Sequence, residues 1–347
     1  MSMDRRSFLR VSAVSAAGML LRIDPLKGKE SAKDPTESTE PLKPKQLKRD
    51  GARPETWITP NETFYIQSID ETPAIKEEKA RFALTGMVEK ERRYHLNDLK
   101  AMKPVKEYRT LSCIGDPVGG RQIGNAEWTA VRLRDLLKEA KPIPEAKRVV
   151  FNCADGYITS FPLKDALDKN MLLAYEMNGV QLPPDHGYPV RLLNPGKYGQ
   201  KCPKWIVSIQ LVKTEHRGFY EKRGWSDVAA VRTATRVGLP SRLDRLPAGK
   251  YKISGSAFDG GNYGGIEKVE VSVDSGATWN DATIWASASP LTWSLWEYEW
   301  EVESALKYAR ILARAVTRDG KTQTDKVEHA GPEGATGYHT VEVRIES

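Results

Sequence analysis

The chain has 347 residues and a formal net charge of +7, with nine tryptophans and thirteen tyrosines. Three arginines and one aspartate give residues 1–21 a charge of +2, eight basic and six acidic residues give residues 22–51 another +2, and only +3 remains for the rest. Because no basic stripe is interleaved with aromatic residues, the sequence excludes a dedicated nucleic-acid-binding protein.

The chain begins with an export signal, in which Arg5 and Arg6 precede Phe8 and the uncharged run 11–21. An arginine pair at this position is typical of the twin-arginine route, whose machinery carries folded proteins. An ordinary secretory signal is the alternative, and the run is too short to span roughly 30 Å of hydrocarbon. No clear cleavage site follows, so an N-terminal anchor stays open. We expect a periplasmic or otherwise exported protein that folds around a cofactor before export.

Composition divides the chain into a signal segment (1–21), a charged and flexible tether (22–58) and two folded domains (59–238 and 239–347). The tether is rich in Lys, Glu, Asp, Pro and Ser and poor in apolar side chains. The remaining sequence is longer than one hydrophobic core usually organises, which predicts two domains.

The first domain mixes strands with helices. Residues 82–88, 148–153 and 205–209 are rich in β-branched and aromatic side chains and are predicted to be strands. Residues 131–140 place three leucines on one face and charges on the other, which predicts a helix. This mixture indicates an α+β domain.

The second domain contains strands at short spacing. Strands are expected at residues 252–258, 269–273, 293–302 and 309–315, with hairpin turns at Asp274-Ser275-Gly276 and Asp319-Gly320. An immunoglobulin-like β-sandwich fits this pattern. A structural or dimerising role is favoured over a catalytic one, because catalysis must be argued from a site.

The three cysteines, Cys113, Cys153 and Cys202, lie far apart, and an odd number leaves at least one thiol free. The sequence contains no Cys-x-x-Cys-His haem motif, iron–sulfur spacing, Gly-rich dinucleotide loop or Walker motif. No haem, flavin or nicotinamide site is therefore expected. Cys153 lies on an apolar strand and is interpreted as structural.

Cys113 ends a strand-like run and opens a loop with several glycines, which lets the backbone approach a bound group. A thiolate is a soft metal ligand, and Arg109 and Arg121 are expected to help keep the sulfur deprotonated. From the spacing alone, a buried structural cysteine is favoured over a metal ligand.

Four sequence blocks, in order from about Pro60 to the C-terminus, resemble the sulfite oxidase family of molybdenum enzymes. They are residues 113–129, 174–191, 195–205, and the C-terminal pair 255–279 and 293–300. The resemblance implies a molybdopterin-binding domain followed by a dimerisation domain of the immunoglobulin-like type.

The resemblance implies roles for individual residues. Cys113 would bind molybdenum, whose other sulfurs come from the dithiolene of a molybdopterin. Asp155 would accept hydrogen bonds from the pterin edge, and His186 and Arg191 would hold the phosphate and pterin. Cys202, Pro203 and Lys204 match the loop over the phosphate. Arginine and aspartate suit these partners, because one donates in a bidentate fork and the other accepts.

The sequence departs from the family in the substrate pocket. Gln67 stands where an arginine is expected, and a second arginine is replaced around Gly331. Arg109 and Arg121 are possible compensating cations. Tyr220 is the candidate for the family's tyrosine near the metal, with a domain-connecting aromatic as the alternative.

The favoured function is an oxygen-atom transfer between molybdenum and a small sulfur-containing or related substrate, with sulfite-type oxidation as the family default. Reduction of S-oxides or N-oxides, and a non-catalytic exported binding protein, are the alternatives. Electrons would pass to a separate carrier, such as a c-type cytochrome or a membrane haem subunit. The other expected partners are the twin-arginine export machinery and a second copy of the chain.

Overall fold

The computed structural model describes residues 56–302 and 307–346. The predicted signal segment and most of the predicted tether lie outside the described residues. Within the described ranges, no helix has both the length and the apolar character needed to cross a membrane.

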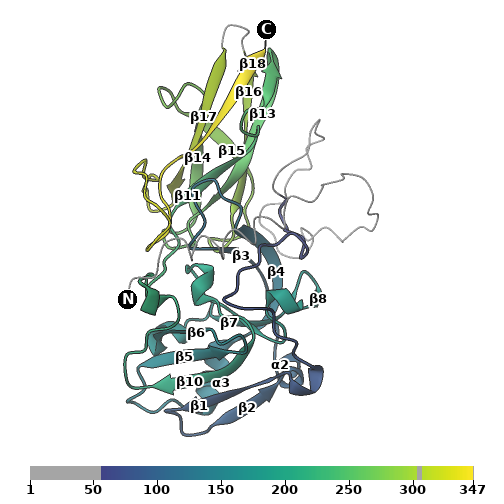
Figure 1. Cartoon of the computed structure of the whole chain (residues 1–347), viewed down its shortest axis with the longest axis vertical. Helices are drawn as coiled ribbons and strands as arrows, with labels where there is room; N and C mark the ends of the chain where they lie inside the picture. Colours follow the sequence, from purple (N-terminus) through teal and green to yellow (C-terminus); the bar gives the residue numbers. More distant parts are fainter. Residues whose placement is uncertain (1–55, 303–306, 347) are drawn as a thin grey trace. The chain divides into compact units, whose positions relative to one another are not determined.

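The first part of the described chain contains two five-stranded sheets (Figure 1). The first sheet, ordered β2-β1-β10-β5-β6, comprises β1 (Arg81–Gly86), β2 (Arg92–His95), β5 (Arg148–Cys153), β6 (Ile158–Pro162) and β10 (Ile206–Val212). The second, ordered β3-β4-β7-β8 with β9 paired to β7, comprises β3 (Val105–Ser112), β4 (Ile123–Arg132), β7 (Leu172–Met177), β8 (Val180–Gln181) and β9 (Arg191–Leu193).

Short helices connect these strands. They are α2 (Leu96–Ala101), α3 (Leu133–Ala140) and α4 (Leu163–Ala166), with 3-10 turns η2 (Glu77–Lys79), η3 (Pro184–His186), η4 (Gly199–Lys201) and η5 (Glu221–Arg223). The three strand predictions and the helix are confirmed with small shifts at their ends. The observed helix, α3, begins two residues later than predicted, because Val131 and Arg132 still pair with β7. Helices are few, so this part is mostly β.

The C-terminal part is one hydrogen-bonded path of eight strands, ordered β11-β13-β16-β15-β14-β17-β18-β12. The strands are β11 (Ala234–Leu239), β12 (Arg245–Pro247), β13 (Gly249–Phe258), β14 (Ile266–Ser272), β15 (Asn280–Ala286), β16 (Ser294–Val302), β17 (Tyr308–Thr317) and β18 (His339–Glu346). The four predicted strands are confirmed, and Ser275 and Gly320 have the positive φ of tight turns. The immunoglobulin-like description stays a prediction.

Hydrogen bonds tie the Cys113 side of the second sheet to the C-terminal strands. On β3, the Thr110 hydroxyl donates to Asn125 Oδ1 at 3.0 Å and accepts the Trp293 amide N–H at 2.8 Å. The Thr110 amide also donates to the Leu291 carbonyl at 3.0 Å. A mixed apolar cluster that includes Ile114 and Trp293 covers these bonds. The strand that leads to Cys113, β3, is therefore hydrogen-bonded both to β4 and to the segment that precedes β16.

Replacing Thr110 with valine should lower stability by about 1–3 kcal/mol, because the Trp293 N–H and the Asn125 carbonyl lose a buried partner. Urea unfolding followed by tryptophan fluorescence measures the effect. Thr283→Val, on an exposed site of β15, is the matched control and should change stability by less than about 0.5 kcal/mol. Equal effects of the two substitutions would contradict the assigned role.

Candidate active site

The β3–β4 pairing presents Cys113 at the end of a closed loop. Ser112 pairs with Ile123, and the Cys113 amide donates to the Gln122 carbonyl at 2.9 Å. Inside the loop, the Asp116 carboxylate accepts the Gln122 amide N–H at 3.1 Å. These hydrogen bonds fix the loop that carries the sulfur, so Cys113 does not lie on a flexible turn.

Burial dominates the electrostatics of this sulfur. It raises the pKa of the Cys113 thiol to about 11, although backbone hydrogen bonds from Gly115 and Asp116 act in the opposite direction. The Asp116 carboxylate raises the pKa further by charge repulsion. Without a bound cation the sulfur is therefore a thiol at neutral pH, and deprotonation requires a metal or another positive group.

The expectation that Arg109 and Arg121 keep this sulfur deprotonated is wrong, because neither contributes to the pKa of Cys113. The Arg109 guanidinium folds back along β3, where Nη2 donates to Glu107 Oε2 at 2.5 Å. Arg121 is exposed. Arg109 is nevertheless buried with two nitrogens, Nε and Nη1, that have no hydrogen-bond partner within the described chain.

Two residues predicted from the sequence do meet at Cys113. The Tyr220 hydroxyl is hydrogen-bonded to the Gln67 side chain, and both Cys113 and Asp155 raise its pKa by charge repulsion. Burial is the largest contribution and raises the pKa of Tyr220 to about 12. Tyr220 is therefore a neutral phenol beside the sulfur at physiological pH.

Tyr65 is a site residue that the sequence analysis missed. Burial and the neighbouring Cys113 raise its pKa well above the usual value, while Arg191 lowers it. A Cβ at Gly199 would lie only 2.9 Å from the Tyr65 hydroxyl, so this glycine allows the close approach. Its position two residues before Gln67 was the available signal, since alternate residues of an extended segment share a side.

His186 and Arg191 form one unit on the second sheet. Arg191 Nη1 donates to the His186 carbonyl at 3.0 Å, and the guanidinium lies 5.2 Å from the centre of the Trp128 ring. His186 Nε2 is hydrogen-bonded to the Asn61 carbonyl at 2.7 Å. Arg191 is buried, and its Nε has no hydrogen-bond partner in the described structure. This open donor fits an anionic or carbonyl oxygen of a ligand.

Lys204 and Asp155 face this unit. Burial and the nearby Arg191 lower the pKa of Lys204 to about 7, although Asp155 acts in the opposite direction. Lys204 Nζ donates to the Asp185 carbonyl at 2.8 Å. Burial raises the pKa of Asp155. The repulsion between the buried Arg191 and the partly buried Lys204 is the condition that a bound anion would relieve.

Cys202 and Pro203 contribute through the backbone and the core. The Asn194 amide donates to Cys202 Sγ at 3.4 Å, and the Leu192 amide donates to the Pro203 carbonyl at 2.9 Å. Both bonds fasten the loop to β9 and its end. All three cysteines are free, and Cys202 and Cys153 are buried.

The segment around Gly331 lies beside the Tyr220 cluster. A Cβ at Gly331 would lie 3.6 Å from the Trp225 ring, whose centre is 6.4 Å from that of Tyr220. A glycine at this position supplies no charge. Gln67, Tyr220 and Gly331 supply no charge on this side of the site, although the charges of Asp155 and Arg223 act on Tyr220 from nearby.

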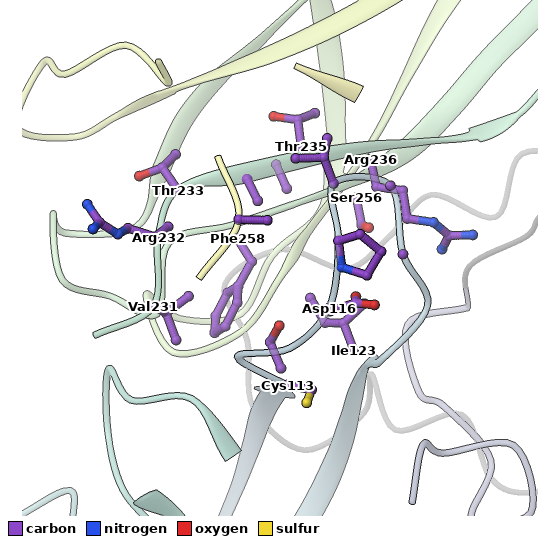
Figure 2. Close-up of a pocket in the computed structure, with 18 of the residues that line it drawn as sticks. Cys113, Asp116, Ile123, Val231, Arg232, Thr233, Thr235, Arg236, Ser256 and Phe258 are labelled. Atoms are coloured by element: carbon purple, nitrogen blue, oxygen red, sulfur yellow. The ribbon is translucent and has the colours of Figure 1, made fainter. Parts of the chain in front are cut away.

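A separate pocket borders the Cys113 loop on the side of the C-terminal strands. It is lined by residues that include Asp116, Arg232, Arg236 and Phe258. Figure 2 shows the Cys113 sulfur directed away from the labelled residues of β11 and β13. This pocket borders Cys113 on the side opposite its sulfur. It is distinct from the group formed by Tyr220, Gln67 and Arg191.

Comparisons with known proteins agree with this arrangement. The model of the oxidoreductase molybdopterin-binding domain matches residues 69–220, and that of the Mo-co oxidoreductase dimerisation domain matches residues 227–345. The chain is 29% identical to the mitochondrial sulfite oxidase of Drosophila melanogaster, over 85% of this chain and 61% of that protein. It is 29% identical to the sulfite oxidase of Gallus gallus, over 79% of this chain and 69% of that protein.

The crystal structure of the sulfane dehydrogenase SoxCD from Paracoccus pantotrophus has the same fold. The TM-score is 0.74, with 22% identity, covering 94% of this chain and 98% of that one. Fold and site together define a molybdopterin-binding oxidoreductase. The chain belongs to the sulfite oxidase family of these enzymes.

Anion binding at Lys204 should depend on pH. In the free protein the pKa of Lys204 is about 7, and a bound anion raises it, so binding takes up a proton above pH 7. The sulfate affinity of cofactor-free protein should fall up to about tenfold per pH unit between pH 7 and 9. Calorimetry measures this slope, with sulfate chosen because it does not titrate in the range.

Lys204→Met should abolish the slope, whereas Lys252→Met on β13 should preserve it. A slope that is unchanged in Lys204→Met would show that another group binds the proton.

Proposed function

We propose that this protein is an exported molybdenum-cofactor oxidoreductase that oxidises a small sulfur-containing substrate by oxygen-atom transfer. The observation that carries the proposal is the convergence on one site of a partly buried thiol, Cys113, a buried arginine with an open donor, Arg191, and a neutral phenol, Tyr220. Those groups are the ligand types expected for a soft metal, an anionic cofactor and a reacting oxygen.

We assign the metal end of the cofactor to Cys113 and its phosphate and pterin to the residues around Arg191. Cys113 would bind molybdenum as a thiolate, releasing the proton that burial otherwise keeps on the sulfur. Arg191, Lys204 and His186 would hold the phosphate and pterin, and Asp155 would accept from the pterin edge. When bound, the cofactor supplies the two-electron redox change and the oxygen-atom exchange.

The chain's own residues would bind and orient the substrate. Tyr220 stays protonated, because its pKa is about 12, so its hydroxyl can donate a hydrogen bond to a substrate oxygen. Gln67 fixes the Tyr220 hydroxyl through their hydrogen bond and offers a second neutral polar group. The overall oxidation adds one oxygen atom from water to the substrate and releases two protons and two electrons.

The neutral pocket favours a substrate that carries little charge at the reacting end. A charge-assisted hydrogen bond contributes about 1.5–3 kcal/mol, so lacking two arginine contacts would weaken binding of a free sulfite dianion by roughly two to four orders of magnitude. The likeness to a sulfane dehydrogenase supports oxidation of a different sulfur compound. Reduction of an S-oxide or N-oxide is the second candidate, because the Gln67–Tyr220 pair suits a neutral oxygen.

Export and partners follow from the sequence. The arginine pair at Arg5 and Arg6 supports the twin-arginine route to the periplasm, with the signal either cleaved or kept as an anchor. Electrons would leave one at a time to a c-type cytochrome or a membrane haem subunit. The match to a dimerisation domain over residues 227–345 supports a homodimer. The immunoglobulin-like sandwich is proposed for residues 239–347.

Protein purified from a host that makes the cofactor should contain about one molybdenum and one pterin per chain, measured by elemental analysis and pterin fluorescence. Cys113→Ser should abolish dye-linked turnover, because a hydroxyl is a poor substitute for the soft thiolate ligand. Cys153→Ser is the matched control and should retain turnover. Absence of molybdenum in the wild-type protein would leave the non-catalytic binding protein.

Gln67→Arg should restore one fixed positive charge beside Cys113 and lower the KM for sulfite by about tenfold or more, as one charge-assisted contact predicts. Steady-state assays with sulfite, a sulfane compound and a sulfoxide measure the change. Gln210→Arg adds the same charge on an exposed site of β10 and controls for long-range attraction. A similar gain in both variants would refute a direct contact at position 67.

A further inference from the structure

Lys201 carries an ammonium group that is almost completely removed from solvent, with 1% of its side chain exposed. Its Nζ donates to the Ser160 carbonyl at 3.0 Å, to Asp227 Oδ1 at 3.1 Å and to Glu221 Oε1. The Glu221 side chain is also 1% exposed. Buried charges are costly unless they are paired and hydrogen-bonded, so both groups depend on this contact.

The ion pair joins two loops of the active site. Lys201 ends η4 and directly precedes the Cys202, Pro203 and Lys204 loop. Glu221 begins η5 and directly follows Tyr220. One buried bond therefore connects the proposed cofactor loop to the backbone that carries the proposed catalytic tyrosine.

Neighbouring contacts reinforce the same connection. The Tyr157 hydroxyl donates to the Gln200 carbonyl at 2.5 Å, and its ring lies 5.6 Å from that of Tyr220. The Gln200 side chain donates to the Ser226 carbonyl at 2.6 Å. Two adjacent residues of η4, Gln200 and Lys201, thus hold the segment 219–227 at its two ends.

Other polar contacts also hold the Tyr220 loop, because the Phe219 amide donates to the Ile158 carbonyl at 2.7 Å, the Ser226 amide donates to the Pro332 carbonyl at 3.2 Å, and Arg148 pairs with Asp227. Thr159 Oγ1 donates to Glu221 Oε1 at 3.1 Å, while Glu221 Oε2 has no hydrogen-bond partner within the described residues. The loop approaches β6 so closely that a Cβ at Gly218 would lie 2.3 Å from the Ile158 carbonyl oxygen. The Lys201 ammonium is the one cation within ion-pair distance of Glu221 among these described residues.

We propose that Lys201 is a positioning residue, which joins the loop of Cys202, Pro203 and Lys204 to the Tyr220 segment and holds the tyrosine beside Cys113. The inference rests on the proposed function for the catalytic role of Tyr220. The structural connection between the loops can be tested without it.

The test uses the full-length protein, both loaded with cofactor and cofactor-free. Lys201→Met removes the ammonium and leaves Glu221 buried without a cation. The double variant Lys201→Met/Glu221→Gln removes both charges. Thr159→Val keeps both charges and removes the hydroxyl that contacts Glu221 and Tyr157. Glu270→Gln, which removes a carboxylate that pairs with Arg314 on the C-terminal strands, is the matched ion-pair control.

Hydrogen exchange of the segment 218–226, the melting temperature, molybdenum content and dye-linked turnover are measured for each variant. We expect Lys201→Met to lower the melting temperature and to speed exchange in this segment at least about tenfold. The double variant should recover much of the melting temperature, because no uncompensated carboxylate remains. Exchange should stay fast and turnover should stay at least about tenfold below wild type in the double variant.

Recovery of turnover together with the melting temperature would overturn the proposal, because Lys201 would then act through stability alone. Exchange as slow as in the wild type, in the double variant or in Lys201→Met, would also overturn it. If Lys201→Met does not fold, the double variant gives the exchange and turnover readings without Lys201. If the wild type contains no molybdenum, the proposed function fails, while the exchange data still decide whether Lys201 orders the loop.

Discussion

The cost of burying positive charge shapes this site more than any other interaction. Lys201, Arg191 and Lys204 lie close together in sequence in the same domain, and the first two are buried while Lys204 is partly buried. Lys201 is neutralised by carboxylates of the chain, whereas the hydrogen bonds of Arg191 and Lys204 go to carbonyl oxygens. A folded domain can keep the last two cations only at a cost that a bound anion offsets. The chain therefore neutralises one cation internally, and the other two are the ones that the proposed function assigns to a bound anion.

Much of the architecture could be predicted from local sequence. The strands at 148–153 and 309–315 are rich in β-branched or alternating apolar residues, and these patterns survive in the folded protein as β5 and most of β17. The boundary between β4 and α3 was predicted less well, because Val131 satisfies a strand pattern and a helix pattern equally. Its ladder partner Leu173 lies far away in sequence, so only tertiary pairing decides between them.

Order along the chain, through the resemblance to a family, is what singled out Cys113, His186 and Arg191, because residue type and spacing alone favoured a structural cysteine. Arg109 was misjudged because its neighbour in sequence, Cys113, is not the partner of its guanidinium, which Glu107 binds instead. Lys201 was not recognised at all. Its partners Glu221 and Asp227 lie 20 and 26 residues further along the chain. The residues next to Lys201 in sequence form no pattern that predicts a buried lysine.

Under the proposed function, the separation of charge within the site would let one domain hold an anionic cofactor and still prefer a substrate with little charge. Cations gather on the Arg191 and Lys204 side, while the side beyond Cys113 presents the amide of Gln67 and the phenol of Tyr220. In a poorly solvated pocket a misplaced cation would attract the wrong anion as strongly as a well-placed one attracts the cofactor. Neutral groups on the substrate side therefore add selectivity, because they leave the anion-binding strength where the cofactor needs it.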